Sequence, residues 1–170
     1  PRDLSASVEA PHAYRLSRIP RSVSWEEVEA TLAAIDQDTA VGRRDYAMLL
    51  LIVLYGLRAR EVAALTLDDL DWRRDRLHVP GRKAGHSTCY PLSPMAGEAL
   101  IAYLRRDRPP TIERRVFLTT YAPRKAVNHH VVSTRAGRYL RLAGVEVSRP
   151  GSHTLRHSCA QRLVDADFSL

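Results

Sequence analysis

The sequence has little of what disulfide-bonded, zinc-binding and membrane proteins depend on. Its two cysteines, Cys89 and Cys159, lie on unrelated segments without paired spacing, so we expect no disulfide framework and no zinc site, but two buried thiols. The longest apolar run, residues 47–55, has about half the length that a bilayer span needs. The N-terminus lacks the charged-then-apolar pattern of a signal peptide. These absences favour a cytoplasmic globular protein.

Lysine is also scarce, although the chain is basic. The 26 basic residues include two lysines, Lys83 and Lys125, and the formal net charge is +7. Residues 1–75 carry 10 basic and 13 acidic groups, whereas residues 76–170 carry 16 basic and 6 acidic groups. Guanidinium groups bind phosphate oxygens two at a time, so this composition favours a phosphate-rich polymer as partner. A GC-rich genome and a solvated surface would produce the same excess of arginine.

The pattern along the 170 residues predicts a mainly α-helical domain with a small antiparallel β-sheet, an α+β fold. Residues 1–23 contain prolines and arginines without any period, so we expect an extended arm or linker there and a single domain over residues 24–170. A β-hairpin is expected over residues 76–92, and residues 116–118 could add a third strand. Capping residues and apolar periodicity predict helices near residues 24–35, 43–55, 58–65, 93–104, 131–143 and 152–163.

The last predicted helix opens with a histidine and an arginine three residues apart, in the stretch RPGSHTLRHSCAQRLV. His153 and Arg156 share a helix face, so one phosphate could contact both. A His-x-x-Arg pair arises about once by chance in a chain of this composition, and the chain holds a second one. The pair therefore gains meaning only from its surroundings. This helix is expected to be capped by Ser152 and to bury Leu155, Cys159 and Leu163.

Three separate elements present cationic groups where the backbone would hold them still. Arg58 lies at a predicted helix–helix corner, Lys83 in the hairpin turn, and His153 with Arg156 at a helix N-terminus. Each has an ordinary structural explanation as well. Arg58 could pair with Glu61 on the surface, Lys83 could be solvated, and His153 could be a neutral cap because a positive charge there opposes the helix dipole.

The order of three motifs distinguishes between these explanations. The segments YGLRAREVAAL, GRKAGHSTCYPL and HTLRH follow one another across about a hundred residues, and together they resemble the catalytic domain of the tyrosine recombinases, the phage-integrase family of site-specific DNA recombinases. The resemblance runs from about Ser24 to the end of the chain. It places the family's first arginine at Arg58, its acidic neighbour at Glu61, its hairpin lysine at Lys83, and its His-x-x-Arg box at His153 and Arg156.

The resemblance implies DNA strand cleavage and rejoining through a 3′-phosphotyrosyl intermediate. Arg58 and Arg156 would stabilise the charge that develops on the nonbridging phosphate oxygens. His153 would orient or deprotonate the attacking hydroxyl, and Lys83 would protonate the departing 5′ oxygen. Because the intermediate retains the phosphate as an ester, no cofactor is implied. No metal-ligand cluster is evident either, since His129 and His130 are adjacent and are expected to diverge.

The sequence departs from the family pattern downstream of the His-x-x-Arg box. The family places its nucleophilic tyrosine well beyond this box, but the chain ends 14 residues after Arg156, and its last tyrosine is Tyr139. We also expect that residues 1–170 do not include the DNA-clamping N-terminal domain of the family. We therefore expect a fragment of a longer recombinase that is inactive alone, with double-stranded DNA as its partner. The parent is expected to act as a tetramer on DNA, and the fragment to be a monomer.

Two other functions remain open from the sequence. One is a noncatalytic DNA-binding or regulatory module that keeps the arginines for phosphate contacts. The other is a helical protein-interaction domain with a basic surface. Type IB topoisomerases use the same chemistry, but the short domain and the compact motifs favour a bacterial-style integrase.

Overall fold

A computed structural model describes residues 23–81 and 87–165 of the chain. In these ranges it contains six α-helices and one three-stranded antiparallel sheet, so the expected α+β class is confirmed. The arm predicted over residues 1–23 lies outside the described residues except for Val23, which is buried in the core. The domain boundary at residue 24 therefore stays a prediction.

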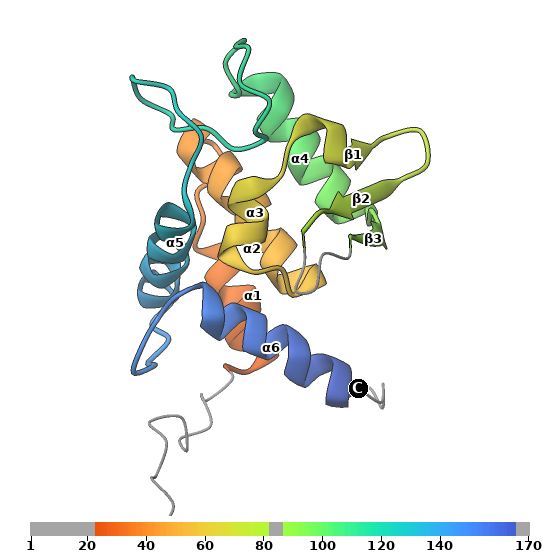
Figure 1. Cartoon of the computed structure of the whole chain (residues 1–170). Helices are drawn as coiled ribbons and strands as arrows, with labels where there is room; N and C mark the ends of the chain where they lie inside the picture. Colours follow the sequence, from red (N-terminus) through yellow and green to blue (C-terminus); the bar gives the residue numbers. More distant parts are fainter. Residues whose placement is uncertain (1–22, 82–86, 166–170) are drawn as a thin grey trace, which may run out of the picture.

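Helix α2 (Ala40–Tyr55) forms the centre of the fold. Every residue from 47 to 53 is buried, because this segment is apolar around its whole circumference and other elements cover it on all sides. Helices α4 (Pro94–Arg106) and α6 (Ser152–Asp165) pack against it, and α1 (Trp25–Ala33), α3 (Ala59–Ala64) and α5 (His129–Leu142) complete the helical shell. In Figure 1, α5 lies on one side of this core, and the sheet lies on the opposite side next to α4.

The sheet follows the α2–α3 corner in the chain. Its strands are β1 (Leu70–Asp71), β2 (Arg76–Val79) and β3 (Thr88–Pro91), in the spatial order β1-β2-β3. Leu77 and Val79 point into the core, whereas Arg76 and His78 face outward, as the alternation along a strand requires. The predicted hairpin is thus formed by β2 and β3, which pair from Arg76–Pro91 to Val79–Thr88.

Several local expectations differ from the structure. Residues 116–118 form no strand; Leu118 makes an isolated bridge with Ala126, and the third strand is β1, which pairs with β2 because the chain turns back after Asp71. Cys159 is buried as expected, but Cys89 lies on the outward face of β3 and is exposed. Ser152 is the first residue of α6 rather than the residue before the helix.

The end of α6 is less buried than its sequence pattern suggests. Leu155 and Cys159 lie in the interior as expected. Leu163 was expected to be buried with them, but it is 45% exposed. The first turns of α6 pack on α2 and α5, and its last turns extend past them, as Figure 1 shows. Local periodicity predicts a helix face, but the neighbouring elements decide how far along the helix that face is covered.

In residues 23–81 and 87–165, no helix combines the length and the apolar character that a membrane crossing needs.

Candidate functional site: two arginines on one carboxylate

A sharp corner between α2 and α3 places Arg58. Helix α2 ends at Tyr55, and the C-cap residue Gly56 adopts the left-handed conformation with φ 58°, which glycine reaches without steric cost. Leu57 is fully buried and anchors the corner in the core. Arg58 then occupies the N-cap position of α3, so its backbone is fixed while its guanidinium group projects to the surface.

Glu61, in the first turn of α3, holds Arg58 in two ways. Its Oε2 atom accepts a hydrogen bond of 2.7 Å from the Arg58 backbone N–H, and its Oε1 atom accepts one of 2.9 Å from Arg58 Nη1. The Glu61 side chain is 10% exposed and that of Arg58 is 46% exposed. The Arg58–Glu61 ion pair, which the sequence suggested as the ordinary structural explanation for Arg58, therefore exists. It also orients the Arg58 side chain.

Arg156 reaches the same carboxylate from α6, about a hundred residues further along the chain. Its Nη1 atom lies 4.0 Å from Glu61 Oε2 and donates to the carbonyl oxygen of Gly56. The Arg156 side chain is 31% exposed. Two guanidinium groups from different elements thus converge on one largely buried carboxylate, and each guanidinium group has part of its surface open to solvent. This arrangement can present two positive forks to a single external anion.

Contacts just before α6 and within its first two turns fix the position of this helix. In α5, Gly137 allows a close approach, because a Cβ atom at this position would lie 2.7 Å from the carbonyl oxygen of Pro150 just before α6. Ser158 donates a hydrogen bond of 2.9 Å to the carbonyl oxygen of Val23. Cys159 packs beneath Gly56 of the corner. These contacts hold Arg156 in register with Arg58.

The structure describes three of the four predicted site residues. Arg58 and Arg156 meet at Glu61, and His153 lies in the first turn of α6, exposed, one helical turn before Arg156. Lys83 lies outside the described residues, between the ends of β2 and β3. The structure therefore brings two of the predicted residues together on a shared carboxylate, and it places a third on the same helix.

Sequence reasoning missed several contributors to this site. Glu61 was noted only as a partner of Arg58, and its approach to Arg156 has no local signal because the two residues are far apart in the chain. The Gly56 carbonyl is a backbone group that no side-chain pattern reveals.

One pKa shift near the corner limits the chemistry available there. Burial raises the pKa of the Cys159 thiol, although the nearby Arg156 partly offsets this effect. Cys159 is therefore protonated at neutral pH and is a packing residue rather than a nucleophile.

His129 and His130 do not diverge as the sequence suggested. Both lie in the first turn of α5, and their ring centroids are 4.1 Å apart. The pKa of His129 is lowered, mainly by partial burial and then by the neighbouring His130 and by Arg60. The lower pKa favours the neutral form of His129. Among the described residues, no group of three or more histidine, cysteine or acidic side chains could hold a metal ion.

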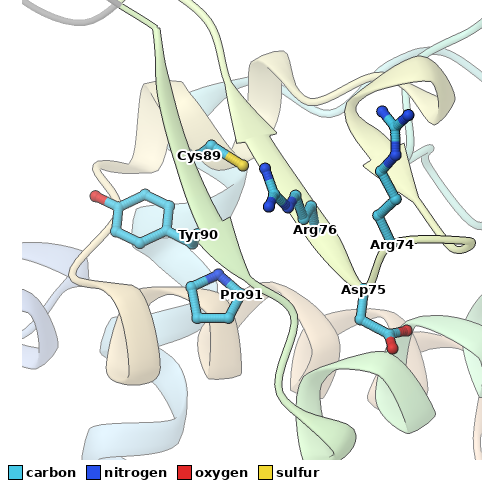
Figure 2. A pocket seen from close by; sticks show the side chains of 6 residues that line it. All are labelled: Arg74, Asp75, Arg76, Cys89, Tyr90 and Pro91. Atoms are coloured by element: carbon cyan, nitrogen blue, oxygen red, sulfur yellow. The ribbon is translucent and has the colours of Figure 1, made fainter.

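A surface hollow beside the sheet does not include the two arginines in its lining. It has a volume of about 470 Å³, and Figure 2 shows the side chains that line it, which come from the β1–β2 turn, the start of β2 and β3. Arg58, His153 and Arg156 do not line it. It is lined by Arg74, Asp75, Arg76, Cys89, Tyr90 and Pro91. The paired arginines thus lie outside this hollow, on an open surface that suits a large partner better than a small enclosed ligand.

Comparisons with known proteins identify the family of this chain. The model of the phage integrase family matches residues 21–170. The chain is 38% identical over 169 residues to the integrase/recombinase y4rA of Sinorhizobium fredii, covering 99% of this chain and 41% of that protein. It is 38% identical over 153 residues to tyrosine recombinase XerC 2 of Ralstonia nicotianae, covering 87% of this chain and 43% of that protein. The chain thus spans less than half the length of these two relatives.

A solved structure shows the same fold at lower sequence identity. The XerH site-specific recombinase, bound to its palindromic difH substrate in a post-cleavage complex, superposes with a TM-score of 0.74 at 22% identity. The match covers 88% of this chain and 43% of XerH. With its corner arginine, its hairpin and its His-x-x-Arg helix in the predicted order, the chain belongs to the phage integrase family.

Proposed function

We propose that this chain is part of the catalytic domain of a site-specific DNA recombinase that cleaves and rejoins DNA strands through a 3′-phosphotyrosyl intermediate. The observation that carries the proposal is the convergence of Arg58 and Arg156 on Glu61. When a phosphodiester is attacked, negative charge grows on its nonbridging oxygens, and two guanidinium groups held in advance stabilise that charge without reorganisation. Relatives named integrase/recombinase and tyrosine recombinase support the same assignment.

The other roles follow from the family resemblance and from chemistry. His153, one turn before Arg156, orients or deprotonates the attacking tyrosine hydroxyl, and Lys83 donates a proton to the departing 5′ oxygen. The nucleophilic tyrosine is expected downstream of the His-x-x-Arg box, in the longer protein. The fragment alone would then bind DNA without cleaving it.

Double-stranded DNA is the proposed partner. The XerH structure was determined with its difH substrate bound, and the C-terminal part of this chain carries the excess of guanidinium groups that a phosphate backbone attracts. We further propose that the longer protein assembles as a tetramer on two DNA sites and that the fragment alone is a monomer. A cytoplasmic location fits an enzyme of bacterial DNA and stays a prediction.

The test uses the full natural reading frame and a nicked suicide substrate that carries its recombination site. We expect a covalent protein–DNA species that survives denaturing electrophoresis, and its formation should slow by about a hundredfold or more in Arg58→Ala and in Arg156→Ala. Arg105→Ala, which changes an exposed arginine at the end of α4, is the matched control and should cleave like the wild type. Salt-sensitive DNA binding without any covalent species would instead favour the noncatalytic DNA-binding module.

A further inference from the structure

Tyr55, the last residue of α2, joins the α2–α3 corner to the end of the β2–β3 hairpin. Its hydroxyl oxygen accepts a hydrogen bond of 2.8 Å from the backbone N–H of Ser93 and donates one of 3.3 Å to Ser93 Oγ. Its ring lies 5.4 Å from the ring of Tyr90 in β3, at an angle of 49°. One side chain thus contacts both the last strand of the hairpin and Ser93, two residues after the strand ends.

Ser93 is itself a junction. Strand β3 ends at Pro91, and Ser93 caps α4, where its Oγ atom accepts a hydrogen bond of 3.3 Å from the backbone N–H of Ala96. The Tyr55 hydroxyl therefore ties the end of α2 to the point where the hairpin meets a rigid helix. A hydrogen bond that includes the N–H of a capping residue fixes the backbone at that point.

The corner has a second attachment on its other side. Gly56, next to Tyr55, accepts from Arg156 and packs on Cys159 of α6. Tyr55 and Gly56 thus connect the two parts of the chain that carry Arg156 and the hairpin. The corner between them carries Arg58.

We propose that Tyr55 is a positioning residue for strand cleavage, which fixes the β2–β3 hairpin, and with it the strands that flank Lys83, against the corner that carries Arg58. This inference rests on the proposed function. A hairpin of four-residue strands has little stability of its own and takes its position from what it packs on. Proton transfer to a leaving group tolerates little misplacement, so a loosened hairpin should slow that step first.

The chemistry of the step supplies a selective test. In the cleavage step, the tyrosine hydroxyl loses its proton to the base proposed at His153 and its oxygen forms a bond to phosphorus. The bond from phosphorus to the 5′ oxygen breaks, and that oxygen takes a proton from the Lys83 ammonium group. A substrate with sulfur in place of the bridging 5′ oxygen releases a thiolate, which is a far weaker base and needs no proton. A defect confined to proton donation therefore disappears with sulfur, whereas a defect in DNA binding or folding persists.

The experiment measures single-turnover formation of the covalent species by the longer protein on both substrates. Tyr55→Phe keeps the ring beside Tyr90 and removes both hydrogen bonds. We expect it to cleave the oxygen substrate about tenfold more slowly than the wild type, and the sulfur substrate within about twofold of it. The matched control, Tyr103→Phe, removes a hydroxyl that accepts from the backbone N–H of Leu118 in the core, and it should match the wild type on both substrates.

Equal slowing on both substrates, or no slowing on oxygen, would overturn the role of Tyr55. The variant Lys83→Ala separates this result from failure of the proposed function. If the wild type forms no covalent species, the strand-cleavage assignment fails. If sulfur does not rescue Lys83→Ala, the assignment of Lys83 as proton donor and the role of Tyr55 fail together. Should Tyr55→Phe not fold, Tyr90→Leu removes the ring contact from the other side. It should show the same rescue by sulfur, and equal slowing would count against the proposal.

Discussion

Glu61 has two opposing effects at the scale of single residues. Its carboxylate orients Arg58 and lies near Arg156, but it also places a negative charge where a DNA phosphate would bind. Removing that charge should therefore strengthen DNA binding and leave Arg58 less well oriented for strand cleavage. A binding assay and a cleavage assay measure these two effects separately.

We expect Glu61→Gln to bind DNA more tightly than the wild type and yet to form the covalent species more slowly in the longer protein. Fluorescence anisotropy with labelled duplex DNA measures the first effect, and the suicide substrate measures the second. Glu98→Gln, at an exposed position on α4, is the control for the loss of one negative charge. Weaker DNA binding by Glu61→Gln would show that its orienting role dominates even in the ground state.

Tyr139 provides a pH-dependent prediction at the same scale. Burial, together with the neighbouring Asp45 carboxylate to which its hydroxyl donates at 3.0 Å, raises the pKa of Tyr139 to about 12. Because the folded state holds this proton more tightly than the unfolded state, the stabilisation is complete below the unfolded pKa of about 10 and is lost as the pH rises towards 12.

The free energy of unfolding of the wild type should therefore fall by roughly 1–3 kcal/mol more than that of Tyr139→Phe between pH 10 and pH 12. Urea denaturation at a series of pH values measures the two slopes. Parallel slopes would mean that Tyr139 ionises as easily in the folded protein as in the unfolded chain.

At the scale of secondary-structure elements, the contact between α5 and the start of α6 depends on a missing side chain. A Cβ atom at Gly137 would meet the Pro150 carbonyl at 2.7 Å, which is backbone and cannot rotate away. Gly137→Ala should destabilise the chain by about 1–3 kcal/mol, measured by urea denaturation. Gly97→Ala in α4 is the matched control, because its nearest neighbour would be Leu92 Cδ2 at 3.8 Å, and it should stabilise by up to about 1 kcal/mol through helix propensity. Equal effects would contradict the close approach.

At the scale of the whole molecule, charge controls association. The net charge of +7 is concentrated in residues 76–170, so we expect DNA affinity to fall steeply with salt concentration as condensed counterions are released. Arg58→Ala and Arg156→Ala should each lower the slope of log Kd against log salt by about 0.9, the value for one phosphate contact. Binding titrations at four or five salt concentrations measure the slope. Unchanged slopes would show that these two arginines do not contact the DNA backbone.

The sequence by itself determined the helices, the hairpin, the fold class and the three short motifs. Each of these depends on residues that lie close together in the chain. Ser24 and Glu27 form the predicted capping box, and Gly56 ends α2 where its position suggested. Hydrogen bonds within four residues and the periodicity of apolar side chains are local, so a linear pattern records them. The family resemblance rests on the same kind of short, ordered pattern.

Tertiary structure alone decided which distant groups meet. The approach of Arg156 to Glu61 and the bond from Tyr55 to Ser93 depend on how the elements pack, and so does the exposure of Leu163. These contacts join residues up to about a hundred positions apart, and their geometry follows from packing over the whole core rather than from any local preference. The sequence therefore named the arginines of the site, and only packing placed them on one carboxylate.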